Sequence, residues 1–311
     1  MIYETKAGRF RWEAQWGGAD LPAFRGPIAG ISTDANDQVY VLTRTKPAIL
    51  IFDRDGRLLE TWDDASFLRP HALLSLGEEG FLVVDDAAHA VFWFDQHKRI
   101  RHVFGEPGVP SDTGCVHKDY RTIQRAAAPF CFPTGAAVGK EGALYFSDGY
   151  GNARVHRFAP DGVLLGSFGQ PGDGPGQFRL PHGILYSKER LYVADRQNHR
   201  VQLFAPDGSF LAEWNDLSRP AAIVHAPDGL FYVAECVHRH RFDHGVSRVS
   251  ILSEDGEIVD RITSPAAEET APGYHTAHAI AVDSLGSLYI GEVGKDWPEG
   301  YSGLIKLKRV D

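Results

Sequence analysis

One strand-and-hairpin pattern recurs along the chain and constrains its fold more than any other feature. Residues 144–162 (LYFSDGYGNARVHRFAPDG) and 191–208 (LYVADRQNHRVQLFAPDG) align almost residue for residue, from an aromatic-rich strand through an acidic residue to an Asp-Gly turn. An Asp-Gly pair between apolar runs is typical of a β-hairpin. Self-similarity at a period of about 40 to 50 residues predicts the blades of a β-propeller.

Four more divergent copies keep the same order of features, and each copy follows another short apolar strand. These copies occupy residues 39–56, 81–98, 231–256 and 288–310. The six preceding strands begin near Pro27, Pro70, Pro133, Pro181, Pro220 and Ala277. Six four-stranded antiparallel units predict an all-β six-bladed β-propeller that forms a single domain over residues 1–311.

The last copy lacks a fourth strand, because the repeat ends at Val310. The N-terminal segment GRFRWEAQWGG (8–18) resembles the fourth strands GVLLGSFGQPG (162–172) and GSFLAEWND (208–216). We therefore expect the N-terminal strand to complete the last blade and to close the ring without a covalent bond.

Charge and cysteine content limit the classes of partner. The net charge of -9, from 32 basic and 41 acidic residues, argues against nucleic-acid binding, which usually needs a basic face. No apolar run reaches the roughly 20 residues of a membrane span, and the first residues lack the apolar core of an export signal. Only Cys115, Cys131 and Cys236 are present, a sparse and odd set that favours a reducing compartment. We expect a cytoplasmic protein without membrane or nucleic-acid partners; the oligomeric state is open.

Histidine recurs at one register position in alternate copies. We call the residue at which each first strand begins its marker residue. The residues that follow the six marker residues are Ile28, His71, Thr134, His182, Ala221 and His278. The innermost strands of a propeller run along its axis, so these positions form a ring at one depth. A single interior histidine is usually a packed side chain, but three in a shared register can bind one ion and leave a position open for water or substrate. The sequence therefore predicts a Zn²⁺ site.

A second ring is read one residue after the end of each second strand, where every copy has an acidic residue except the first, which has Thr43. Its members are Arg44, Asp86, Gly149, Arg196, Cys236 and Val293, with Tyr150 one residue beyond Gly149. An arginine at a strand end is usually an ion-pair partner. Two arginines beside a metal ion indicate instead an anionic ligand, because clustered positive charge is otherwise costly. We expect a small-molecule substrate that carries a carboxylate.

Several motifs at these positions resemble the peptidylglycine α-amidating lyase family, which cleaves peptidyl-α-hydroxyglycine to a peptide amide and glyoxylate. The motifs are FCFPTG (130–135), SDGYGNARVHRFAPDG (147–162), LPHGI (180–184) and VADRQNHRVQLF (193–204), and the Asn-x-Arg-Val cores at Asn152 and Asn198 resemble NHL repeats. The resemblance implies zinc-binding histidines at His71, His182 and His278, an active-site tyrosine at Tyr150, and two active-site arginines at Arg44 and Arg196.

The sequence also departs from that family. Ala279 stands where the family has an aspartate that helps to bind a structural calcium ion, so calcium is not carried over. Gly151 stands where the family has a cysteine, so Cys131 lacks its disulfide partner. Both departures fit an intracellular variant. The loops at 105–129 and 236–245 look unlike the family and are expected to reshape the pocket.

The resemblance implies a zinc-dependent lyase that cleaves the C–N bond of an N-acyl-α-hydroxyglycine-type carbinolamide, giving an amide and glyoxylate. Zinc would polarise the hydroxyl, Tyr150 would serve as general base or acid, and Arg196 or Arg44 would hold the carboxylate. Without an export signal, a small metabolite is favoured over a secreted peptide. Two alternatives are a metal-dependent hydrolase of an ester or lactone and a non-catalytic interaction platform. The segment 236–245 also offers a possible second metal cluster, formed by Cys236, His238, His240, Asp243 and His244.

Overall fold

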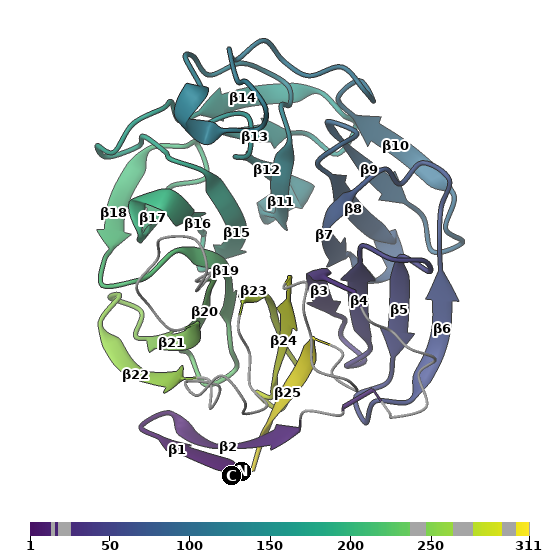
Figure 1. Ribbon diagram of the computed structural model, residues 1–311, viewed down its shortest axis with the longest axis vertical. Helices are drawn as coiled ribbons and strands as arrows, with labels where there is room; N and C mark the ends of the chain where they lie inside the picture. Colours follow the sequence, from purple (N-terminus) through teal and green to yellow (C-terminus); the bar gives the residue numbers. More distant parts are fainter. Residues whose placement is uncertain (14–15, 18–25, 237–246, 264–275, 294–302, 311) are drawn as a thin grey trace. The chain divides into compact units, whose positions relative to one another are not determined.

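The computed structural model describes residues 1–13, 16–17, 26–236, 247–263, 276–293 and 303–310. Six antiparallel sheets, drawn in Figure 1, make the fold an all-β six-bladed propeller, as the repeats predict. Each blade begins with the strand expected after its marker residue. In the part of the chain that the structure describes, no helix is long and apolar enough to cross a membrane.

The chain divides into two compact units, which are described in turn. The unit Ala65–Pro220 holds three complete blades. Blade two contains β7 (Pro70–Ser75), β8 (Phe81–Asp85), β9 (Ala90–Phe94) and β10 (Ile100–Phe104). Blade three contains β11 (Pro133–Val138), β12 (Leu144–Asp148), β13 (Arg154–Phe158) and β14 (Leu164–Phe168). Blade four contains β15 (Pro181–Ser187), β16 (Arg190–Asp195), β17 (Arg200–Phe204) and β18 (Phe210–Trp214).

The other unit combines Met1–Asp64 with Ala221–Asp311. Blade one contains β3 (Ile28–Thr33), β4 (Val39–Thr43), β5 (Ile49–Phe52) and β6 (Leu58–Trp62). Blade five contains β19 (Pro220–His225), β20 (Phe231–Glu235), β21 (Arg248–Leu252) and β22 (Ile258–Thr263). Blade six contains β23 (Ala277–Val282), β24 (Leu288–Glu292), β25 (Leu304–Arg309), β2 (Gly8–Glu13) and β1 (Ile2–Thr5).

The N-terminal strand completes blade six, as expected from its likeness to the other fourth strands. Strand β2 pairs antiparallel with β25, with Trp12 opposite Leu307, and Figure 1 shows the two side by side. The two ends of the chain thereby join in one sheet and close the ring. Strand β1, which the repeat did not predict, pairs with β2 and makes this blade five-stranded.

Apolar side chains from neighbouring blades pack into shared cores. In blades two and three, Phe104 from β10 lies 5.1 Å from Phe146 and 5.3 Å from Phe158, measured between ring centroids. All three rings are buried. Each aromatic ring that leaves water contributes a large apolar area to folding, so these contacts hold the outermost strand of blade two, β10, against β12 and β13 of blade three.

Candidate active site

Two of the candidate metal ligands lie in the Ala65–Pro220 unit, each as the second residue of an innermost strand. His71 follows Pro70 in β7, and His182 follows Pro181 in β15. Nδ1 of His71 donates a hydrogen bond of 2.8 Å to the backbone oxygen of Thr134. Since a carbonyl can only accept, this bond places the proton on Nδ1 and leaves the Nε2 lone pair available to a metal.

His278 occupies the same position in β23 of the other unit. Nδ1 of His278 donates to the backbone oxygen of Ala29 over 3.1 Å, which again places the ring proton on Nδ1 and makes Nε2 the candidate metal-binding nitrogen. The same tautomer therefore arises from the same kind of carbonyl contact in both units.

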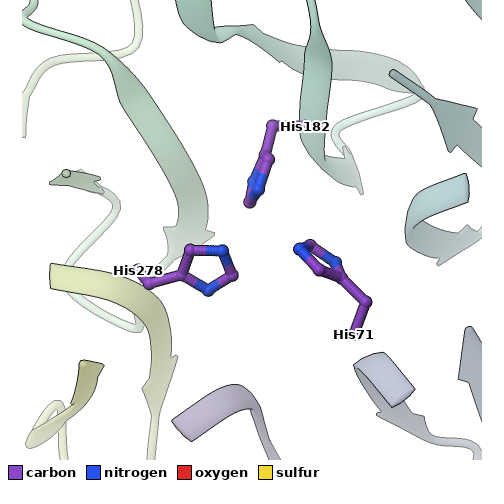
Figure 2. A group of neighbouring side chains, drawn as sticks. All are labelled: His71, His182 and His278. Atoms are coloured by element: carbon purple, nitrogen blue, oxygen red, sulfur yellow. The ribbon is translucent and has the colours of Figure 1, made fainter. Parts of the chain in front are cut away.

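The three imidazoles form a group that could hold one metal ion. Candidate ligand atoms of His71, His182 and His278 all lie within 4.8 Å of one another, and all three side chains are buried. Figure 2 shows the rings turned toward a common point. Nitrogen ligands of tetrahedral zinc, with bonds of about 2.1 Å, lie about 3.4 Å apart. The three nitrogens are therefore close enough together to serve as ligands of one metal ion.

Tyr150 lies directly against two of these histidines. Its phenol oxygen is 3.0 Å from Nε2 of His71 and 3.1 Å from Nε2 of His182. Both imidazoles meet the phenol ring edge to face, with interplanar angles of 87° and 83°. The phenol hydroxyl therefore lies beside both candidate metal-binding nitrogens. From this position it could exchange a proton with a substrate hydroxyl group that lies next to the three histidines.

Buried carboxylates fix the backbone from which these histidines project. Asp85, at the end of β8, accepts hydrogen bonds from the backbone nitrogens of Leu68 (2.8 Å) and Arg69 (2.9 Å), just before His71. Asp195 accepts from the backbone nitrogen of Arg179 over 2.8 Å, just before the Pro181–His182 step. Burial raises the pKa of Asp195 to about 6. The acidic residues that end β8 and β16 thus hold the backbone segments that precede these two histidines.

The same relationship recurs at the third histidine. Glu292, at the end of β24, accepts a hydrogen bond of 2.9 Å from the backbone nitrogen of Thr276, two residues before His278. Glu292 is fully buried. Sequence reasoning used these acids as markers of register and missed their contact with the strand that carries the histidine. Each of these acids lies 14 or 15 residues after the marker residue of its blade, and this nearly constant spacing was the available signal.

Thr134 is a further residue that the sequence reasoning passed over, because its ring position carries no histidine. Its backbone oxygen holds His71, and its hydroxyl oxygen lies 2.8 Å from the backbone oxygen of Pro181. Ser147 in β12 donates to the backbone oxygen of His182 over 2.5 Å. Blade three therefore links the strands that carry His71 and His182.

The two candidate arginines differ in their surroundings. Arg196 begins the short 3-10 turn Arg196–Asn198 and is 5% exposed. Its backbone nitrogen donates to the oxygen of Leu180 over 3.1 Å, which ties the turn to the segment before His182. Arg44 follows β4 in the other unit and has an exposed side chain. The structure thus buries Arg196 in the unit that holds Tyr150.

Lys118, from the 105–129 loop, also reaches Tyr150. Its ammonium nitrogen lies 4.2 Å from the centroid of the phenol ring and donates to Asp86 over 2.8 Å. Asp86 belonged to the second predicted ring, but Lys118 gave no signal in the sequence, because an irregular loop has no periodicity from which a contact can be inferred.

The three cysteines are free thiols. A Cβ atom at Gly151 would lie 2.6 Å from Sγ of Cys131, which agrees with the position expected for the missing disulfide partner. Burial raises the pKa of Cys131 to about 12 and also raises the pKa of Cys115. Both thiols therefore stay protonated near neutral pH and are poor nucleophiles. Of the possible second metal cluster in segment 236–245, only Cys236 is among the described residues; His238, His240, Asp243 and His244 lie outside them.

These features define the class of protein: a six-bladed β-propeller with NHL-type repeats and a buried three-histidine group that could hold a metal ion. A family model described as NHL repeat matches residues 178–204. The chain is a six-bladed propeller that contains a matched NHL repeat, and its sequence is similar to those of peptidylglycine α-amidating enzymes and of NHL repeat-containing protein 3.

Three relatives illustrate that relationship. Peptidyl-glycine alpha-amidating monooxygenase A of Xenopus laevis is 28% identical over 322 residues, which cover 90% of this chain and 32% of that protein. NHL repeat-containing protein 3 of Homo sapiens is 27% identical, covering 89% of this chain and 80% of that protein. A probable peptidyl-alpha-hydroxyglycine alpha-amidating lyase of Caenorhabditis elegans is 26% identical, covering 79% and 67%. The chain spans about a third of the length of the Xenopus monooxygenases.

Solved structures share the fold at low identity. A streptogramin B lyase superposes with a TM-score of 0.64 at 14% identity, covering 96% of this chain and 97% of that one. A gluconolactonase from Xanthomonas campestris gives a TM-score of 0.61 at 14% identity, covering 99% and 97%. At this identity the likeness shows the propeller alone, because one fold hosts many chemistries.

Proposed function

We propose that this protein is a zinc-dependent lyase that cleaves an N-acyl-α-hydroxyglycine into an amide and glyoxylate. The observation that carries the proposal is the position of Tyr150, whose phenol oxygen lies within hydrogen-bond distance of Nε2 of both His71 and His182. Cleavage of the C–N bond of a carbinolamide requires a group that takes the hydroxyl proton. It is helped by a metal ion that polarises the hydroxyl. The relationship to amidating lyases supports the same chemistry.

A zinc ion held by His71, His182 and His278 would act as a Lewis acid on the substrate hydroxyl. Tyr150, acting as the phenolate, takes the hydroxyl proton as the C–N bond breaks, the bonding electrons leave with the amide nitrogen, and Tyr150 returns that proton to the nitrogen. The carbon that carried the hydroxyl becomes the aldehyde carbon of glyoxylate, and the nitrogen receives a proton to complete the amide. Atoms and charge balance without an oxidant, a reductant or added water.

Arg196 is the residue that we assign to the substrate carboxylate. It is buried in the unit that holds Tyr150, and a guanidinium in such a position binds a carboxylate through two parallel hydrogen bonds. Arg44 is the second candidate and is exposed. We also propose that the acyl group of the substrate is small and that the protein works in a reducing compartment. The three free cysteines support the second of these points.

The test combines metal content with a glyoxylate-release screen. Purified protein is analysed for zinc, and glyoxylate is measured with small N-acyl-α-hydroxyglycines such as α-hydroxyhippurate. We expect one zinc per chain, glyoxylate release, and loss of both in His182→Ala. His225→Ala removes a histidine that is not part of the group and serves as the control.

The screen includes an ester and a lactone. Hydrolysis of these compounds without glyoxylate release would replace the lyase with a metal-dependent hydrolase. Protein that binds no stoichiometric zinc and turns over none of the substrates would contradict both enzyme assignments and leave an interaction platform.

A further inference from the structure

Residues 113–118, within the 105–129 loop, contact both the backbone and the ring of Tyr150. Oγ1 of Thr113, a residue only 1% exposed, donates to the backbone oxygen of Gly151 over 2.6 Å. Sγ of Cys115 lies 3.9 Å from the backbone oxygen of Tyr150. Two consecutive carbonyl groups of the Tyr150 turn are thus bound by one short segment about 35 residues earlier in the chain.

Lys118 contacts the ring itself. Its ammonium nitrogen lies 4.2 Å from the centroid of Tyr150 and 5.0 Å from that of Phe132. A cation at this distance over an aromatic face is attracted by the negative charge density of the ring. The contact restrains the tilt of the phenol, whose oxygen must stay between two imidazole nitrogens.

A buried carboxylate holds the ammonium in place. Asp86, which is fully buried after β8, accepts from Nζ of Lys118 over 2.8 Å and from Nε of Arg69 over 2.6 Å. The backbone at His117 and Lys118 has φ values of 51° and 60°, a region that residues other than glycine rarely adopt. The ion pair with Asp86 is one contact that stabilises the loop in this conformation.

We infer that Lys118 is a positioning residue for Tyr150, anchored by Asp86, and that it sets the phenol orientation needed for proton transfer. This inference rests on the proposed function for its kinetic consequences. Lys118 acts through Tyr150 and does not itself touch the reacting atoms. Its contribution should therefore appear in kcat and leave substrate binding unchanged.

Lys118→Met tests the role of the charge, since methionine keeps most of the apolar stem. We expect kcat to fall about tenfold with KM within about twofold of wild type and zinc content unchanged. Lys118→Arg should recover kcat to within about threefold, because guanidinium also pairs with carboxylate and lies over aromatic rings. Lys140→Met removes a lysine that pairs with Glu189 at the surface and should change nothing.

A raised KM with unchanged kcat in Lys118→Met would overturn the positioning role, since it would place Lys118 on the substrate. Wild-type kinetics in this variant would overturn it as well. Asp86→Asn should lower kcat in the same way, and the double variant should be no worse than Lys118→Met. If the losses in kcat from the two substitutions add in full, Asp86 does not act through Lys118.

A readout without turnover keeps the inference separate from the proposed function. Amide hydrogen exchange is followed in the peptide that spans 148–153, where Gly151 N donates to the oxygen of Cys131. We expect faster exchange there in Lys118→Met and unchanged exchange in the equivalent blade-four segment, 195–200. If wild type releases no glyoxylate, the lyase proposal fails and this comparison still decides the role of Lys118; unchanged exchange in both segments would refute it.

Discussion

The phenol oxygen of Tyr150 lies 3.1 Å from Nε2 of His182, although the two residues come from different blades. Tyr150 follows β12 of blade three, and His182 lies in β15 of blade four. A hydrogen bond between Ser147 and the backbone oxygen of His182 connects the same two strands. This hydrogen bond helps to hold Tyr150 and His182 at a fixed separation.

Tyr150→Phe removes only the phenol oxygen and should separate catalysis from metal binding. We expect zinc content and thermal stability to match wild type, and kcat for glyoxylate release to fall at least about 100-fold, the usual contribution of a general acid or base. Tyr186→Phe, which loses a hydroxyl at the far end of β15, should keep wild-type turnover. Full activity of Tyr150→Phe would remove Tyr150 from the mechanism.

Asp85→Asn should weaken both the fold and the metal site. The amide places a donor where the carboxylate accepts from the nitrogens of Leu68 and Arg69, so we expect a loss of about 2–4 kcal/mol in the free energy of unfolding. Zinc affinity should fall about tenfold, because His71 follows these residues directly. Urea unfolding and zinc titration measure the two effects. Asp207→Asn, at an exposed turn, is the control; equal losses in both variants would refute a special role for Asp85.

Gly151→Cys should create a disulfide with Cys131 under oxidising conditions. The new Cβ would lie 2.6 Å from Sγ of Cys131, somewhat nearer than the separation of about 3 Å across a disulfide. The ring of Phe132, at 2.7 Å, and the backbone oxygen of Cys131, at 2.8 Å, must shift to make room. We expect a loss of two hydrogens by mass spectrometry after oxidation, reversed by a thiol reductant. Persistence of two titratable thiols at these positions in the oxidised variant would show that the surrounding atoms do not shift enough for the bond to form.

Phe10→Ala tests the strand that closes the ring. Phe10 in β2 is fully buried and packs against Tyr232, with the ring centroids 6.1 Å apart. Removing such a ring from a packed core costs about 3–5 kcal/mol. Urea unfolding should show this loss, whereas Ile2→Ala, in the exposed part of β1, should cost less than about 1 kcal/mol. Similar small losses in both variants would mean that β2 is dispensable for closure.

The sequence alone determined the number of blades, the first residue of each innermost strand and the three-histidine register. These features depend on local periodicity and on a repeat that places equivalent residues at equivalent depths. The closing role of residues 8–13 followed from the same repeat, because those residues match the missing fourth strand.

Only the tertiary structure decided what surrounds Tyr150. The contact with Lys118 joins residues 32 positions apart through an irregular loop, and no periodic pattern predicts where such a loop returns. Arg196 is buried and Arg44 is exposed, although both residues hold the same position in the repeat. Repeats determine backbone register, whereas burial and side-chain partners depend on the neighbouring loops that differ from one blade to the next.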